Sequence, residues 1–348
     1  MKTIQLFITT LIFIALILHG HSQSYVKDIK DLKSPIQNAV PDVNGKILIS
    51  GELDEMYASG ENRNSIEVME GWPVYGSGEA QRGGIYCDLD EDPELEIVYN
   101  IGNKTYAWDY DGTLLPGWPQ EVQLFPSGAP AFGDVDGDGK GEIVVSSRQV
   151  PYSNEGWLYV FEADGSITSG FPVYLNGGAV KTPVLADLDA DNAMEIIIEE
   201  SNYPQGFLTV YGGDGHVYPG FPFEFDGLPG SAVAVGDITG DDIPEIVAES
   251  YFSVYAFDNN GNVLEGFPYT PGNDRVFSYS SPVLADLDGD GLREIICGDH
   301  QTAGDINGAV HILKNDGSLF PGWPQYTSHW VYGPPSILSV PIMVSHGP

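Results

Sequence analysis

The chain has 348 residues, of which 50 are Asp or Glu and 14 are Lys or Arg, so its formal net charge is −36 at pH 7. This charge repels phosphate backbones and argues against nucleic acid as a partner. Hydrophobic residues still make up 42% of the chain and aromatic residues 11%, which is enough to form a core. The charge therefore does not indicate disorder, and the acidic residues must be concentrated at particular places.

The first segment of the chain, residues 1–22, is a predicted secretory signal peptide. A positive charge precedes an apolar run over residues 4–18, and the small residues Gly20 and Ser22 fit cleavage after Ser22. The run is too short for a membrane span, and no later stretch is apolar enough to be one. We expect a poorly ordered tail over residues 23–40 and a secreted protein, extracellular or at the cell surface. The alternative is an uncleaved anchor.

From about residue 80 to 326 the sequence repeats with a period of about 50 residues, in five full units. Each unit contains an acidic loop of nine residues, with Asp at positions 1 and 5, Asp or Thr at position 3 and Glu at position 9. We number them loop one to loop five; they begin at Asp88, Asp134, Asp187, Asp237 and Asp286. A Gly-Trp/Phe-Pro motif keeps the same period and begins at Gly71, Gly117, Gly170, Gly220, Gly266 and Gly322.

Each unit reads as four short strands. An apolar stretch precedes the acidic loop, a β-branched run such as 195–198 follows it, and an alternating strand such as 157–161 comes next. An Asp-Gly or Asn-Gly turn then leads to a last edge strand. Four strands in about fifty residues are typical of one propeller blade.

The predicted fold is therefore all-β: a β-propeller over residues 41–348 with about six four-stranded blades, seven being the alternative. Residues 46–75 and 332–340 resemble two parts of one further blade. Sharing a closing blade between the termini is one way to remove free sheet edges. We expect a monomer in which the Gly-Trp/Phe-Pro rings pack between blades.

The acidic loops predict calcium sites. Carboxylates at positions 1, 3 and 5 of a tight loop repel each other unless a cation lies between them, and calcium takes six to eight oxygen ligands. Magnesium fits less well, and zinc would need His or Cys, which the loops lack. We expect up to five structural Ca²⁺ ions. The expected ligands are Asp88, Asp90, Asp92 and Glu96; Asp134, Asp136, Asp138 and Glu142; Asp187, Asp189, Asp191 and Glu195; Asp237, Thr239, Asp241 and Glu245; and Asp286, Asp288, Asp290 and Glu294.

Two loops depart from the pattern, so their occupancy is left open. Loop four has Thr239 at position 3 and loses one charge. Loop one has Pro93 at position 6, where a left-handed residue such as Gly139 is expected and proline cannot adopt that conformation.

Repeated acidic loops at this spacing resemble the FG-GAP/VCBS repeats of the integrin α-subunit N-terminal-like propeller superfamily. The resemblance covers about residues 42–340 and matches residue by residue in loops two and five. It implies calcium in the interstrand loops and extracellular adhesion or ligand binding. Integrin loops end in Asp, whereas these loops end in Glu, which favours the bacterial secreted type.

No catalytic motif stands out in the sequence, and its five arginines are scattered. The favoured function is a binding, adhesion or scaffolding module for an extracellular protein or glycan, with Tyr152, Tyr203 and Tyr279 as candidate contacts. The alternative is a polysaccharide lyase or hydrolase acting on acidic glycans. The two cysteines, Cys87 and Cys297, are expected to be buried free thiols rather than a disulfide.

Overall fold

The chain divides into two compact units, Met1–Met69 and Glu70–Pro348. The computed structural model describes residues 39–41, 47–49, 71–80, 83–148, 154–175, 177–179, 181–272, 274–302 and 307–337. In the first unit, β1 (Ala39–Pro41) pairs antiparallel with β2 (Ile47–Ile49). The predicted signal peptide, and most residues of the expected closing blade, lie outside the described residues.

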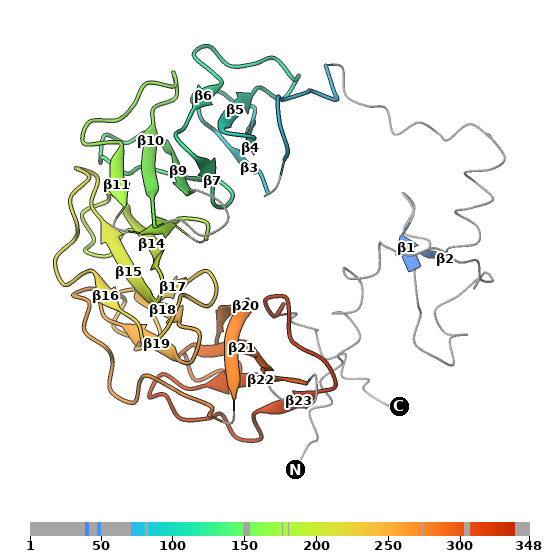
Figure 1. Ribbon diagram of the computed structural model, residues 1–348, viewed down its shortest axis with the longest axis vertical. Coiled ribbons are helices and arrows are strands. Elements are labelled where there is room, and N and C mark those ends of the chain that lie inside the picture. The colour runs from blue at the N-terminus through green and yellow to red at the C-terminus, as the bar shows by residue number, and fades with distance from the viewer. Residues whose placement is uncertain are drawn as a thin grey trace, which may run out of the picture. The chain divides into compact units, whose positions relative to one another are not determined.

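The second unit contains five antiparallel sheets that follow one another in chain order (Figure 1). The first sheet contains β3 (Ile85–Cys87), β4 (Glu96–Ile101), β5 (Lys104–Trp108) and β6 (Gln120–Glu121). The second contains β7 (Phe125–Pro126), β8 (Ala131–Gly133), β9 (Glu142–Arg148), β10 (Gly156–Phe161) and β11 (Val173–Leu175). The third contains β12 (Gly178–Ala179), β13 (Val184–Ala186), β14 (Glu195–Asn202), β15 (Gln205–Tyr211) and β16 (Phe223–Glu224).

The fourth sheet contains β17 (Ala234–Gly236), β18 (Glu245–Glu249) and β19 (Val254–Phe257), and the fifth contains β20 (Arg275–Ala285), β21 (Glu294–Gln301), β22 (Gly308–Leu313) and β23 (Gln325–Thr327). The described residues contain strands and no helix, so the all-β prediction is confirmed. The predicted hairpin turns are present as well. At one of them, Gly165 has a φ of 78° and its N–H donates to the carbonyl of Glu162 at 2.8 Å.

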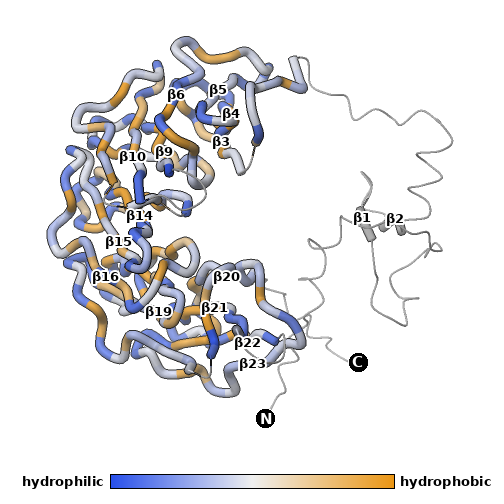
Figure 2. Tube along the Cα trace, viewed as in Figure 1, coloured by the Kyte–Doolittle hydropathy of each residue, from blue (hydrophilic) through white to orange (hydrophobic). Residues whose placement is uncertain are grey.

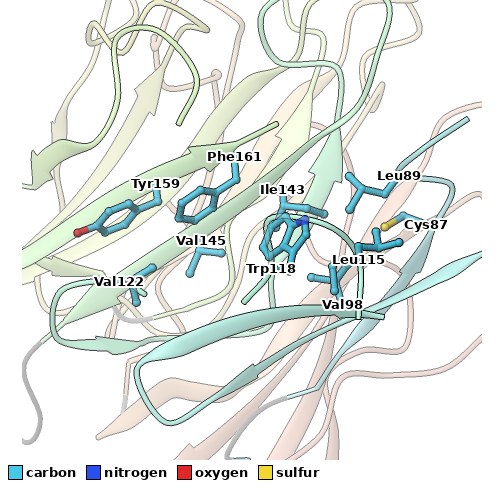
Figure 3. Packing of buried hydrophobic residues seen from close by; sticks show 11 residues of the cluster. Cys87, Leu89, Val98, Leu115, Trp118, Val122, Ile143, Val145, Tyr159 and Phe161 are labelled. Atoms are coloured by element: carbon cyan, nitrogen blue, oxygen red, sulfur yellow. The ribbon is translucent and has the colours of Figure 1, made fainter. Parts of the chain in front are cut away.

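Each sheet packs against the next through its own apolar cluster. In β14, Ile196 and Ile198 face the second sheet, whereas Ile197 faces the fourth, because side chains alternate along a strand. Figure 3 shows the cluster between the first and second sheets, where Trp118 lies among residues of both. Burying a side chain of this size stabilises the fold by roughly 1.5–3 kcal/mol.

In the third, fourth and fifth sheets, the strand that follows the acidic loop changes from apolar to polar residues toward its end. Figure 2 shows β21 changing from hydrophobic to hydrophilic along its length. In β14 and β18 the corresponding residues, Glu199 and Glu249, are buried. This transition follows the sequence pattern, in which a β-branched run gives way to polar residues.

The Gly-Trp/Phe-Pro motif connects each repeat to the next. Gly117 has a φ of 88°, and a Cβ at this position would collide with the carbonyl oxygen of Asp164 in the following repeat. The Trp118 indole Nε1 donates to the carbonyl of Ala163 at 2.8 Å, and its ring meets Phe161 edge-on at 5.8 Å. The prediction that these rings pack between sheets is confirmed for Trp118, and glycine is required for the close approach. The aromatic–proline peptide bond is cis in all six motifs.

Both cysteines are buried and free, as predicted. Burial raises the pKa of Cys87 to about 12 and also raises that of Cys297. Their thiols are therefore protonated components of the apolar clusters rather than reactive groups.

Candidate metal sites in the acidic loops

Each acidic loop joins two strands that pair with each other, β3 to β4, β8 to β9, β13 to β14, β17 to β18 and β20 to β21, and its position-9 Glu is the first residue of the later strand. In loop two, the carboxylate of Asp134 accepts hydrogen bonds from the N–H groups of Gly137 at 2.8 Å and Gly139 at 2.9 Å. Both glycines are left-handed, with φ of 77° and 92°. The loop therefore curls around its first aspartate because glycine at positions 4 and 6 permits it.

The position-9 glutamate turns back over its own loop. One oxygen of Glu142, Oε2, accepts the N–H of Val135 at 2.7 Å. The same bond, from the N–H of position 2, is present at Glu96, Glu195, Glu245 and Glu294. The other oxygen of Glu142, Oε1, is buried and has no hydrogen-bond partner. An unpartnered buried carboxylate oxygen is costly, so this atom marks a place for a ligand.

Four loops bring three acidic side chains together, with one oxygen of each lying within 4.8 Å of the others. These groups are Asp88, Asp90 and Glu96; Asp134, Asp136 and Glu142; Asp187, Asp189 and Glu195; and Asp286, Asp288 and Glu294. One oxygen, Oδ1, of each position-5 aspartate accepts a hydrogen bond from the N–H of position 7; these aspartates are Asp92, Asp138, Asp191, Asp241 and Asp290. The structure thus groups positions 1, 3 and 9, and position 5 braces the loop.

Burial and mutual repulsion raise the pKa of the position-9 glutamates. Desolvation is the largest cause at Glu142 and Glu195, whose pKa rises to about 7, and neighbouring loop aspartates add to it. The pKa of Glu96, Glu245 and Glu294 is raised for the same reasons. A cation between these groups would favour their charged forms.

The two irregular loops behave differently from each other. Pro93 has no N–H to donate to Asp88, yet the three acidic groups of loop one still converge. In loop four, the hydroxyl of Thr239 donates to Glu245 Oε1 at 3.2 Å. In loop four, therefore, the Thr239 hydroxyl is a hydrogen-bond partner for Oε1 of the position-9 glutamate. The same oxygen has no partner in loop two.

The donor set fits a hard cation. The converging ligands in these four groups are carboxylate oxygens without histidine or cysteine, which suits calcium rather than zinc. Backbone N–H groups hold the first aspartate of the groups in loops two, three and five, so this ligand is positioned before any ion binds.

One contact to the loops could not be read from the repeats. The hydroxyl of Tyr218 donates to Asp189 Oδ2 at 3.0 Å, from a position 29 residues further along the chain. The equivalent residues of neighbouring repeats, Leu115, Thr168 and Leu264, lack a phenol. The only sign of this contact in the sequence was a tyrosine at a position where those repeats have leucine or threonine.

Successive antiparallel sheets, each with an acidic loop at the same place, define a repeat protein with oxygen-rich candidate cation sites. Residues 134–198 match the family model described as FG-GAP-like repeat, so the resemblance noted in the sequence is confirmed for that segment. In the part of the chain that the structure describes, no helix is long and apolar enough to cross a membrane. A sequence comparison with curated proteins gives no match.

Several solved structures are similar to this chain. The crystal structure of the Vibrio cholerae biofilm matrix protein Bap1 is 22% identical, with a TM-score of 0.49, over 71% of this chain and 39% of that one. BBS1N, solved in complex with ARL6DN, is 14% identical, with a TM-score of 0.43, over 75% and 72%. A quinoprotein alcohol dehydrogenase-like protein from Bacteroides thetaiotaomicron is 12% identical, with a TM-score of 0.40, over 67% and 53%. The match to Bap1 thus spans well under half of that protein's length.

Proposed function

We propose that this chain is a secreted, calcium-binding β-propeller that acts as a binding, adhesion or scaffolding module for an extracellular protein or glycan. The observation that carries the proposal is the buried, unpartnered Oε1 of Glu142, which lies beside Asp134 and Asp136 in a loop geometry repeated from sheet to sheet. Stacking of five sheets through successive apolar clusters supports the propeller.

Calcium has a structural role in this proposal. Held by the acidic groups of loops one, two, three and five, it neutralises their repulsion and pins together the two strands that each loop joins. Loop four, which carries Thr239 in place of an aspartate, binds more weakly. Each ion that binds only the folded chain adds to its stability by mass action.

The calcium proposal is tested by thermal unfolding with saturating calcium and with excess chelator. A single site saturated at a hundred times its Kd adds about 2.7 kcal/mol, so several sites should raise the melting temperature by many degrees. Glu142→Gln should lower the calcium-dependent gain, and Glu265→Gln, at an exposed residue outside the acidic loops, should leave it unchanged. Identical melting curves with calcium and with chelator would refute the calcium sites.

The binding role is supported by exposed aromatic side chains outside the acidic loops. Tyr203 is 75% exposed and Tyr279 is 49% exposed, so both can reach a ligand. Tyr152 lies outside the described residues. An array of glycans and extracellular matrix proteins, probed with the calcium-loaded chain, tests this role. Loss of a bound ligand on Tyr203→Ala would support this contact, and no binding to any member would count against the module.

The lyase alternative requires a basic group free to take a sugar proton. Arg275 does not supply one, because its guanidinium pairs with the buried carboxylate of Asp299, which also contacts His311 Nε2 at 2.7 Å. A lyase assay on pectic and other acidic polysaccharides separates the two functions, since clear turnover would overturn the binding-only role.

A further inference from the structure

Loops two and three are in direct contact. The N–H of Met194, at position 8 of loop three, donates to the carbonyl of Asp134, the first residue of loop two, at 2.7 Å. A Cβ placed on Gly133 would collide with the thioether of Met194, and one placed on Gly137 would lie 3.4 Å from the methyl of Ala193. Loop three therefore packs on the backbone of loop two, both near Gly133 and Asp134 and near Gly137.

The residues in this contact adjoin the proposed ligands on both sides. Asp134 is itself a proposed ligand of loop two. Met194 lies between Ala193, whose N–H donates to Asp191 Oδ1 at 2.8 Å, and Glu195, the position-9 carboxylate of loop three. An ion bound in loop three restrains the backbone on both sides of Met194. The N–H of Met194 is then held in the direction of the Asp134 carbonyl.

The other neighbouring loops have weaker connections. Between loops one and two, Lys140 and Glu91 approach at 3.9 Å, but their side chains are 61% and 63% exposed, and such pairs contribute little. Between loops four and five, Leu292 lies beside Gly240 without a hydrogen bond. Among the described residues, only loops two and three share a backbone hydrogen bond.

We propose that cation binding at loop three strengthens cation binding at loop two, and, because coupling between sites is reciprocal, that the converse holds. This inference rests on the proposed calcium sites and adds that two of them act as a pair. The expected coupling is about fivefold in affinity, at the lower end of the range typical of coupled sites. Met194 acts here through its backbone, as a positioning residue.

The test follows each loop separately by amide hydrogen exchange during a calcium titration of the whole chain. Peptides covering residues 134–142 and 187–195 report the calcium midpoint of loops two and three. Glu195→Gln, which keeps the size of the side chain, should remove the protection of loop three and raise the midpoint of loop two about fivefold. Glu294→Gln, in the distant loop five, is the matched control and should leave the midpoint of loop two unchanged.

Each result decides the proposal. If Glu195→Gln abolishes protection of loop three and leaves the midpoint of loop two unchanged, the coupling is absent. If Glu195→Gln fails to fold, the milder Asp189→Asn must shift both midpoints together, and a shift in loop three alone overturns the coupling. Calcium-independent exchange of loop two in the wild-type chain would refute the calcium sites themselves. The two failures are therefore distinguishable.

Discussion

Replacing Gly117 by alanine should destabilise the chain more than the same replacement at Gly322. Both glycines begin a Gly-Trp-Pro motif and both are left-handed, with φ of 88° and 91°. A non-glycine residue in this conformation costs roughly 1–2 kcal/mol, and this cost is common to the two variants. At Gly117 the new Cβ would also collide with the carbonyl oxygen of Asp164, whereas at Gly322 no atom of the described residues lies within 4 Å.

The difference between the two variants isolates the contact between repeats. Relieving the collision requires the backbone to shift, which typically costs a further 1–3 kcal/mol or so. Gly117→Ala should therefore lose roughly 2–5 kcal/mol and Gly322→Ala roughly 1–2 kcal/mol. The shift should also disturb the bond from Trp118 Nε1 to Ala163 and change the tryptophan fluorescence.

The assay is denaturant unfolding of both variants and the wild-type chain at saturating calcium, so that differences in ion binding do not contribute. Equal losses of unfolding free energy at the two positions would refute the reasoning, because they would show that the left-handed conformation alone requires glycine and that the contact with the next repeat does not.

Three further predictions concern single side chains. Burial raises the pKa of Glu249 to about 8, with Glu199 and Asp299 near it and the hydroxyl of Ser231 and the charge of Lys181 opposing the shift. The folded chain therefore keeps a proton on Glu249 that the unfolded chain releases above about pH 4.3. The stabilising effect of this proton is full below that pH and is lost as the pH rises through 8. Over this range the free energy of unfolding falls by up to about 1.4 kcal/mol per pH unit. Glu249→Gln should reduce this slope in urea unfolding at constant calcium, whereas Glu265→Gln should leave it unchanged. Tyr218→Phe deletes the donor to Asp189 and should raise the calcium midpoint of loop three about fivefold; an unchanged midpoint in hydrogen exchange would mean that the phenol does not position the loop. Pro93→Gly restores an N–H near Asp88 and should tighten calcium at loop one about fivefold, as measured by exchange of residues 88–96; equal or weaker binding would contradict this role.

The acidic loops could be predicted in detail because their information is local. All four predicted ligands of a loop fall within nine consecutive residues, and the left-handed positions are occupied by glycine in the clearest cases, such as Gly137 and Gly139. The strand after each loop follows from its β-branched run. The effect of Pro93 was harder to predict: proline cannot adopt the left-handed conformation expected at position 6, so the sequence leaves the occupancy of loop one open, yet its three acidic groups still meet.

The particular residues that meet from distant parts of the chain could not be predicted, since no local pattern relates them. Met194 meets Asp134 across sixty positions of sequence, and Tyr218 meets Asp189 from the far end of its own repeat. The burial of Glu249 is of the same kind. A glutamate after an apolar run is ordinarily exposed, and only packing of the neighbouring sheet removes it from water.

The sequence by itself determined the all-β class, the period of about fifty residues and the convergence of acidic side chains, because strand pairing and loop closure depend on residues close together in the chain. Only the tertiary structure decided which carboxylate oxygen is left without a partner, which loop touches which, and why glycine begins the Gly-Trp/Phe-Pro motifs at Gly71, Gly117, Gly170, Gly220 and Gly266. These features depend on the approach of one sheet to the next, which is set by packing of side chains from separate repeats.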